Sequence, residues 1–123
     1  MLLVVDDQAA IRQLLAEALG GEHEVVLAAD GYEAIKLVQQ NRPDLILLDL
    51  KMPGLSGLET LREINKLSPG IPVILVTAYG EVSDPEEAER MGVRCLIIKP
   101  FDLNEVRAVV RRVLEGFRFD FGS

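Results

Sequence analysis

The stretch that decides the fold is residues 44–54, which read DLILLDLKMPG. Its four consecutive aliphatic residues lie between a charge and a Pro-Gly turn, a pattern typical of a strand buried on both faces. The run ends in Asp49, so a carboxylate is expected where the strand leaves the core. Asp49 could simply open the turn, as aspartate often does. It could instead be a nucleophile or metal ligand at the carboxyl edge of an α/β sheet, where ligands usually bind.

The composition fits one globular domain. The chain has 123 residues, 49% of them hydrophobic, with a formal net charge of −7, which allows a single core and excludes a disordered chain. The acidic balance argues against direct contact with nucleic acid. No apolar run approaches the ~18 residues of a membrane span, and we find no signal peptide. The only cysteine, Cys95, is expected in the core, so no internal disulfide is possible. These features predict a cytoplasmic protein.

Strand and helix patterns alternate along the chain. Strands are predicted over residues 1–5, 24–29, 45–48, 71–76 and 93–98, and helices over residues 8–19, 30–40, 56–67, 84–91 and 102–113. Three of the helices begin with Asp or Ser followed three residues later by Glu, which predicts capping boxes at Asp30, Ser56 and Asp102. The alternation predicts an α/β fold with a parallel sheet and right-handed crossovers.

Four predicted strands end in residues that suit one chemical site, namely Asp6 and Asp7, Asp49, Thr77 and Lys99. Parallel strands share one carboxyl edge, so these side chains can meet. Each has an ordinary explanation, as a helix cap, a turn hydroxyl or a solvated charge. Together, however, three crowded carboxylates repel one another unless a cation is present, and Mg²⁺ suits such ligands. A lysine and a hydroxyl beside them predict phosphoryl transfer, with Asp49 as nucleophile.

Several motifs, in this order and spacing, resemble the receiver domain of two-component response regulators. They are VVDD at 4–7, LDLKMPG at 48–54 with Gly57, TA at 77–78 and KPF at 99–101. The resemblance covers roughly residues 1–115 and leaves residues 116–123 as a C-terminal tail or linker stub. Within the family, the chain is most similar to the single-domain receiver of the sporulation phosphorelay.

The resemblance implies a doubly wound, flavodoxin-like fold with a five-stranded parallel sheet of order 2-1-3-4-5 and five helices. It implies that the chain accepts a phosphoryl group from a histidine kinase or a histidine phosphotransfer protein and signals by a conformational change. Such a receiver is a signalling phosphoacceptor that catalyses its own phosphorylation and dephosphorylation. We expect a monomer or a weak phosphorylation-dependent dimer.

The resemblance also implies roles for individual residues. Asp49 would accept the phosphoryl group, Thr77 would reorient toward it, and Lys99 would pair with it. Ala78 would leave room beside the phosphate, and the Lys99–Pro100 bond would be cis. The residues surrounding Mg²⁺ would be Asp6, Asp7, Asp49 and, through its backbone carbonyl, Lys51.

The chain departs from the family pattern in two places. Leu96 stands where receivers usually have an aromatic switch residue, and Pro85 delays the helix after the fourth strand. Both lie on the face that many receivers use for output, so the output route, and not the phosphorylation chemistry, is in question.

The first helix has more apolar surface than the sheet requires, because Leu15, Ala18 and Leu19 suffice to cover it. We therefore expect a partner surface formed by Gln8, Ile11, Leu14, Tyr79, Pro100 and Phe101. The alternative is that Ile11 and Leu14 are ordinary core residues on a wide helix face. The lone His23 is expected in a solvated loop away from the site, so the phosphohistidine donor must be another protein.

Three other functions are weighed against this one. An aspartyl-phosphate phosphatase of the haloacid dehalogenase type also uses Asp, Thr or Ser, Lys and Mg²⁺, but its nucleophile lies on the first strand, two residues before a second acid. A nucleotide- or flavin-binding module requires a glycine-rich first loop, for which residues 6–8 are unsuitable. A receiver used only for protein contacts would not need all five site residues.

Overall fold

The computed structural model of the chain describes residues 1–78 and 80–116. Its strands and helices, in chain order, are β1 (Leu2–Val5), α1 (Ala9–Leu19), β2 (Val25–Ala28), α2 (Gly31–Gln40), β3 (Leu45–Leu48), α3 (Gly57–Leu67), β4 (Val73–Thr77), α4 (Pro85–Arg90), β5 (Val93–Ile98) and α5 (Leu103–Leu114). The five strands form one parallel sheet in the order β2-β1-β3-β4-β5. The predicted fold class and strand order are confirmed.

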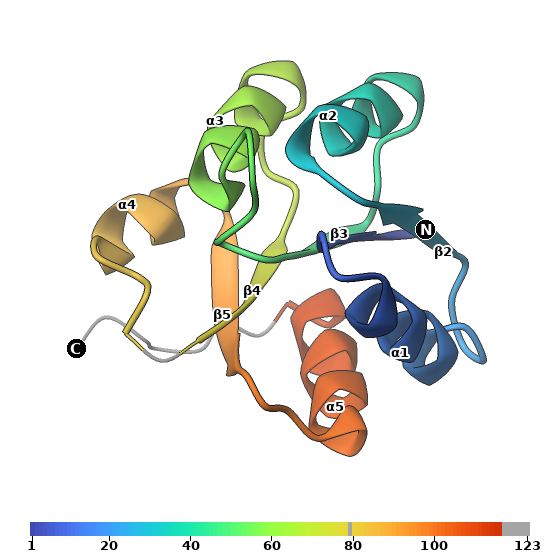
Figure 1. The fold of residues 1–123 in the computed structure, drawn as a ribbon. Coiled ribbons are helices and arrows are strands. Elements are labelled where there is room, and N and C mark those ends of the chain that lie inside the picture. The colour runs from blue at the N-terminus through green and yellow to red at the C-terminus, as the bar shows by residue number, and fades with distance from the viewer. Residues whose placement is uncertain (79, 117–123) are drawn as a thin grey trace.

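The helices cover both faces of the sheet (Figure 1). Helices α2 and α3 lie on one face, with α4 beside β5, and α1 and α5 lie on the other. Successive side chains of a strand point to opposite faces, so Leu3 and Val5 pack toward α2 and α3 while Leu2 and Val4 pack toward α1 and α5. None of the helices in the described ranges is long and apolar enough to span a membrane.

Strand β3 has the environment that its sequence predicts. Its four side chains are at most 1% exposed, because helices cover both of its faces, and the next residue, Asp49, donates its N–H to the Val5 carbonyl. Cys95 is a free, buried thiol on β5, also as expected. Burial raises the pKa of this thiol to about 11, so it stays protonated at neutral pH.

The prediction of three capping boxes is correct only at α3. There the Ser56 hydroxyl accepts the Glu59 N–H, and the Glu59 carboxylate accepts the Ser56 N–H. Asp30 and Asp102 accept backbone N–H groups, but in the described residues no return bond from the third residue is formed. The N-cap φ angle is −66° at Ser56, −155° at Asp30 and −96° at Asp102, so the N–H groups point in different directions.

Gly57 allows α3 to begin directly against the segment that carries Asp49. A Cβ atom at position 57 would lie 2.3 Å from the Asp49 carbonyl oxygen and 2.7 Å from the Leu50 Cα. Both are backbone atoms, which cannot rotate away as a flexible side chain can. A 2.8 Å hydrogen bond from the Gly57 N–H to the Leu50 carbonyl stabilises this close approach. Gly57, three residues after the LDLKMPG motif, therefore allows α3 to begin against the backbone that carries Asp49.

Candidate functional site

Strand register brings the predicted site residues to one edge of the sheet. Val5 is level with Leu48 in the β1–β3 pair, so Asp6 and Asp49 follow at the same height on neighbouring strands. Thr77 is the last residue of β4 and is level with Ile98, the last residue of β5, so Lys99 follows immediately after β5. The Lys99–Pro100 peptide bond is cis, as predicted.

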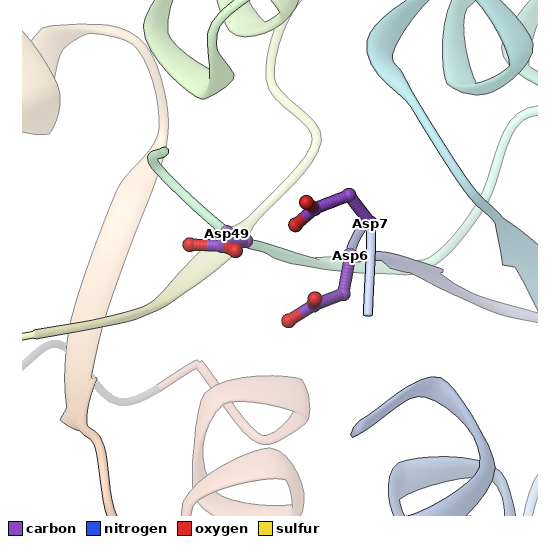
Figure 2. Close-up of side chains that lie close together, drawn as sticks. All are labelled: Asp6, Asp7 and Asp49. Atoms are coloured by element: carbon purple, nitrogen blue, oxygen red, sulfur yellow. The ribbon is translucent and has the colours of Figure 1, made fainter. Parts of the chain in front are cut away.

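An acidic cluster forms where β1 and β3 end, and Figure 2 shows its three side chains gathered there. Asp6, Asp7 and Asp49 each offer one carboxylate oxygen, and these atoms lie within 4.8 Å of one another. Asp6 is 1% and Asp49 6% exposed, whereas Asp7 is exposed. Burial, and then the neighbouring charge of Asp6, raise the pKa of Asp49 above its usual value, against the opposing effect of Lys99. Keeping Asp49 ionised at this edge of the sheet therefore costs free energy.

Lys99 supplies positive charge within the cluster. Its Nζ lies 3.2 Å from Asp6 Oδ2 and 3.3 Å from Asp49 Oδ2. Burial by itself would lower the pKa of Lys99, but the charges of Asp6 and Asp49 outweigh it and raise that pKa above the usual value. The lysine is therefore a cation at neutral pH and pairs with both buried carboxylates.

Backbone amides hold the remaining carboxylate oxygens. The Gln8 N–H donates to Asp6 Oδ1 at 2.9 Å, and the Lys51 N–H donates to Asp49 Oδ1 at 3.3 Å. Arg12 Nη1 donates to the Asp6 carbonyl at 2.7 Å and ties α1 to the end of β1. These bonds orient the buried carboxylates before any ligand arrives.

Thr77 is buried beside the cluster, but its hydroxyl donates to a neighbour that our sequence analysis did not assign, Glu81. The Ala78 N–H also donates to Glu81, at 3.2 Å, and Lys51 Nζ lies 3.4 Å from the same carboxylate. The Thr77 hydrogen bond is the main cause that lowers the pKa of Glu81. The only sequence signal for Glu81 is its position four residues after Thr77. Acidic residues are too common in loops for that position to identify it.

These residues surround a polar cleft of about 210 Å³, whose lining is Asp7, Gln8, Asp49, Lys51, Ala78, Glu81 and Lys99. Three carboxylates with oxygens this close form the hard-oxygen donor set that Mg²⁺ prefers. The donor set therefore fits the predicted ion.

Four residues of the predicted partner surface, Ile11, Leu14, Pro100 and Phe101, line an apolar hollow of about 410 Å³ together with Lys99. Leu14 is 42% exposed, whereas Ile11 is half-buried, packs against the core and also lines the hollow. Gln8 is exposed at the cleft. Tyr79 lies outside the described residues.

Two further residues of the sequence analysis lie away from the cleft. Leu96 is half-buried and packs on the α2 and α3 side of the sheet. His23 is half-buried rather than fully solvated, in the loop between α1 and β2. This loop leads into the amino end of a parallel strand, so His23 is at the opposite edge from the acidic cluster.

Comparisons with known proteins agree with this geometry. The family described as "Response regulator receiver domain" matches residues 2–111. The chain is 41% identical over 114 residues to Sporulation initiation phosphotransferase F of Bacillus subtilis (strain 168), covering 92% of each chain. It is 38% identical to Regulatory protein AtoC of Escherichia coli (strain K12), covering 93% of this chain but 25% of that protein.

Solved structures share the fold. The receiver domain of NtrX from Brucella abortus superposes with a TM-score of 0.86 at 35% identity, covering 94% of this chain and 99% of that one. The chemotaxis protein CheY4 of Vibrio cholerae gives a TM-score of 0.80 at 30% identity, covering 91% and 96% of the two chains.

The doubly wound sheet and the acidic pocket at its carboxyl edge define a signalling phosphoacceptor module. The chain belongs to the response regulator receiver domain family, and the pocket of Asp6, Asp7 and Asp49 fits the phosphoacceptor site of that family. It resembles in particular the single-domain receiver of the sporulation phosphorelay. The phosphatase alternative gains no support, because the match is to receivers and the isolated acid lies after β3, not on β1.

Proposed function

We propose that the chain accepts a phosphoryl group on Asp49 from a phosphohistidine of a histidine kinase or a histidine phosphotransfer protein. The observation that carries this proposal is the Asp49 carboxylate, which lines the cleft, has an oxygen within 4.8 Å of those of Asp6 and Asp7 and lies 3.3 Å from the Lys99 amine. The similarity to a named phosphotransferase over 92% of both chains supports it. The cytoplasmic location expected from the sequence belongs to the same proposal.

The reaction requires a positioned nucleophile and compensation of charge. A carboxylate oxygen of Asp49 attacks phosphorus, a P–O bond forms as the P–N bond breaks, and the electron pair of that bond remains on the departing imidazole. Lys99, held 3.3 Å from Asp49 Oδ2, is placed to offset charge on the phosphoryl oxygens. Thr77, the last residue of β4, brings a hydroxyl donor to the same edge of the sheet. Hydrolysis of the resulting aspartyl phosphate by the same residues, in which water attacks phosphorus and the Asp49 carboxylate leaves, is also part of the proposal.

Asp6, Asp7, Asp49 and the Lys51 backbone carbonyl would hold Mg²⁺. When bound, the ion would neutralise charge that the carboxylates and the phosphoryl group bring together. Asp6 and Asp49 remain aligned by their amide hydrogen bonds.

We further propose that residues 1–115 are the receiver domain and residues 116–123 a tail or linker stub. The family match to residue 111 and the end of α5 at Leu114 support the boundary. Residues 117–123 lie outside the described part of the chain.

Phosphotransfer tests the function directly. When the chain is mixed with a phosphohistidine-bearing phosphotransfer domain and Mg²⁺, we expect label to leave the histidine and appear on this chain, with at most one phosphoryl group per molecule. Intact mass and labelled-phosphate gels measure both partners. Retention of all label on competent donors, together with no labelling by acetyl phosphate, would contradict the proposal.

The hollow beside α1 is proposed as the surface on which the donor docks. An apolar patch next to a phosphorylation site suits a transient helical partner. Leu14→Ala should slow transfer from the cognate donor roughly tenfold, as loss of an interface anchor does. Labelling by acetyl phosphate should stay unchanged, and unfolding free energy should fall by less than about 1 kcal/mol, because Leu14 is 42% exposed.

Leu67→Ala is the matched control for Leu14→Ala, because Leu67 is 48% exposed on α3, at the opposite face of the sheet. It should leave transfer from the donor unchanged. If Leu14→Ala instead destabilises the fold by the ~2–5 kcal/mol typical of a core truncation, Leu14 is a core residue and the docking surface is wrong.

A further inference from the structure

The Glu81 carboxylate accepts hydrogen bonds from donors at the end of β4, beside the polar cleft. We infer that Glu81 is a positioning residue that holds the Thr77 hydroxyl in the unphosphorylated receiver and must release it when Asp49 is phosphorylated. The inference rests on the proposed phosphorylation of Asp49 and adds a residue to it.

Three donors, two from the end of β4 and one from the segment after Asp49, converge on the Glu81 carboxylate. Oε2 accepts the Thr77 hydroxyl and the Ala78 N–H, and Oε1 lies 3.4 Å from Lys51 Nζ. The Glu81 side chain is 16% exposed, and Thr77 is 1% exposed. A hydroxyl, an amide and an ammonium group around one oxyanion constitute an anion-binding site, and in this state an internal carboxylate fills it.

Two of these three donors, Ala78 and Lys51, border the space that a phosphoryl group would enter, and Thr77 precedes Ala78 in the chain. Glu81, Ala78 and Lys51 line the cleft together with Asp49. Phosphoryl and carboxylate oxygens prefer the same charge-assisted donors, and a hydroxyl donates only one hydrogen bond at a time. Thr77 therefore cannot donate to Glu81 and to a phosphoryl group on Asp49 at once. Repulsion between the two anions acts in the same direction.

Release of Glu81 would also affect the loop between β4 and α4, outside the cleft. Glu81 lies in the loop between β4 and α4, and the next residue, Val82, packs against the core on the α2 and α3 side. A ligand shifts such an equilibrium only through its different affinity for the two states. Here the difference in affinity comes from the Thr77 hydroxyl, which would donate to a phosphoryl oxygen in place of Glu81.

Binding of beryllium fluoride, which forms a mimic of an acyl phosphate on a carboxylate, tests the inference in the presence of Mg²⁺. Glu81→Ala should raise the affinity roughly tenfold. In the Thr77→Val background the same substitution should raise the affinity clearly less, because the hydroxyl for which the two anions compete is gone and only the repulsion between the anions is relieved. Glu63→Ala removes an exposed charge on α3 and should have no effect in either background.

A second measurement does not depend on the Thr77 variant. The Ala78 amide resonance of the unmodified chain should move when beryllium fluoride is added, and Glu81→Ala should shift it beforehand. Lower affinity in Glu81→Ala, equal gains in both backgrounds, or an unmoved Ala78 resonance would overturn the inference. If the unmodified chain binds no beryllium fluoride and accepts no phosphoryl group, the proposed function itself fails, which is a distinct result.

Discussion

Replacing Asp49 by asparagine is expected to reduce phosphoryl labelling to background, with both acetyl phosphate and a phosphohistidine donor. Asparagine has nearly the same shape but no carboxylate to attack phosphorus. The other cleft residues, including Lys99, remain in place, so the loss isolates the nucleophile. Time courses of labelling, with Mg²⁺ present throughout, measure the effect. Glu63→Gln, which makes the same change of charge on exposed α3, should label normally.

The same variant should be more stable than the unmodified chain in the absence of metal. Because the pKa of Asp49 is raised by the fold, ionised Asp49 lowers stability at neutral pH. The advantage of Asp49→Asn should be present at neutral pH and should fade as the pH falls through the raised value toward the usual 3.8, where the carboxylate protonates in both states. Thermal unfolding in chelator measures it. A variant that was both unlabelled and unfolded would leave the nucleophile unassigned and would contradict this expectation.

Removal of Mg²⁺ is expected to have the second large effect. With chelator present, labelling by acetyl phosphate should fall to background, and the melting temperature should drop. A ligand that binds only the folded state at 100 times its Kd adds about 2.7 kcal/mol, which corresponds to several degrees in a domain of this size. Differential scanning fluorimetry across a magnesium titration measures the shift.

Asp7→Asn separates a metal effect from a general salt effect. Asp7 is the exposed member of the cluster, so its substitution leaves the buried Asp6 and Asp49 paired with Lys99. It should flatten the magnesium titration, whereas Glu63→Gln should leave it intact. An unmodified chain whose melting temperature ignores Mg²⁺, or an Asp7→Asn titration identical to that of the unmodified chain, would refute the shared site.

The sequence was sufficient to predict the main fold and to place the principal site residues together. Strand β3 is a run of four aliphatic residues, a pattern typical of a strand in a sheet covered on both faces, and Asp49 follows it at the edge. The apolar runs end in polar or charged residues. Asp6, Thr77 and Lys99 could therefore be assigned to one site from the sequence alone. The family resemblance added the strand order and the cis Lys99–Pro100 bond, both of which the structure confirms.

What the sequence could not predict depends on side-chain direction and on backbone approach. The hydroxyl of Thr77 donates to Glu81, and no pattern in the sequence distinguishes that acid from other loop acids. The close approach of α3 to Asp49 depends on how the two backbones pass each other at Gly57, which no local sequence pattern encodes. Likewise, helical spacing alone could not separate exposed Leu14 from half-buried Ile11.

The measurement that tests the central claim most directly is the location of the phosphoryl group on the chain. After transfer from a phosphohistidine donor in the presence of Mg²⁺, reduction with borohydride converts an aspartyl phosphate to homoserine, which peptide mass spectrometry can locate. We predict homoserine at position 49 alone, with Asp6 and Asp7 unmodified. Homoserine at Asp6 or Asp7, or phosphate retained on His23 or a hydroxyl side chain with position 49 intact, would contradict the account.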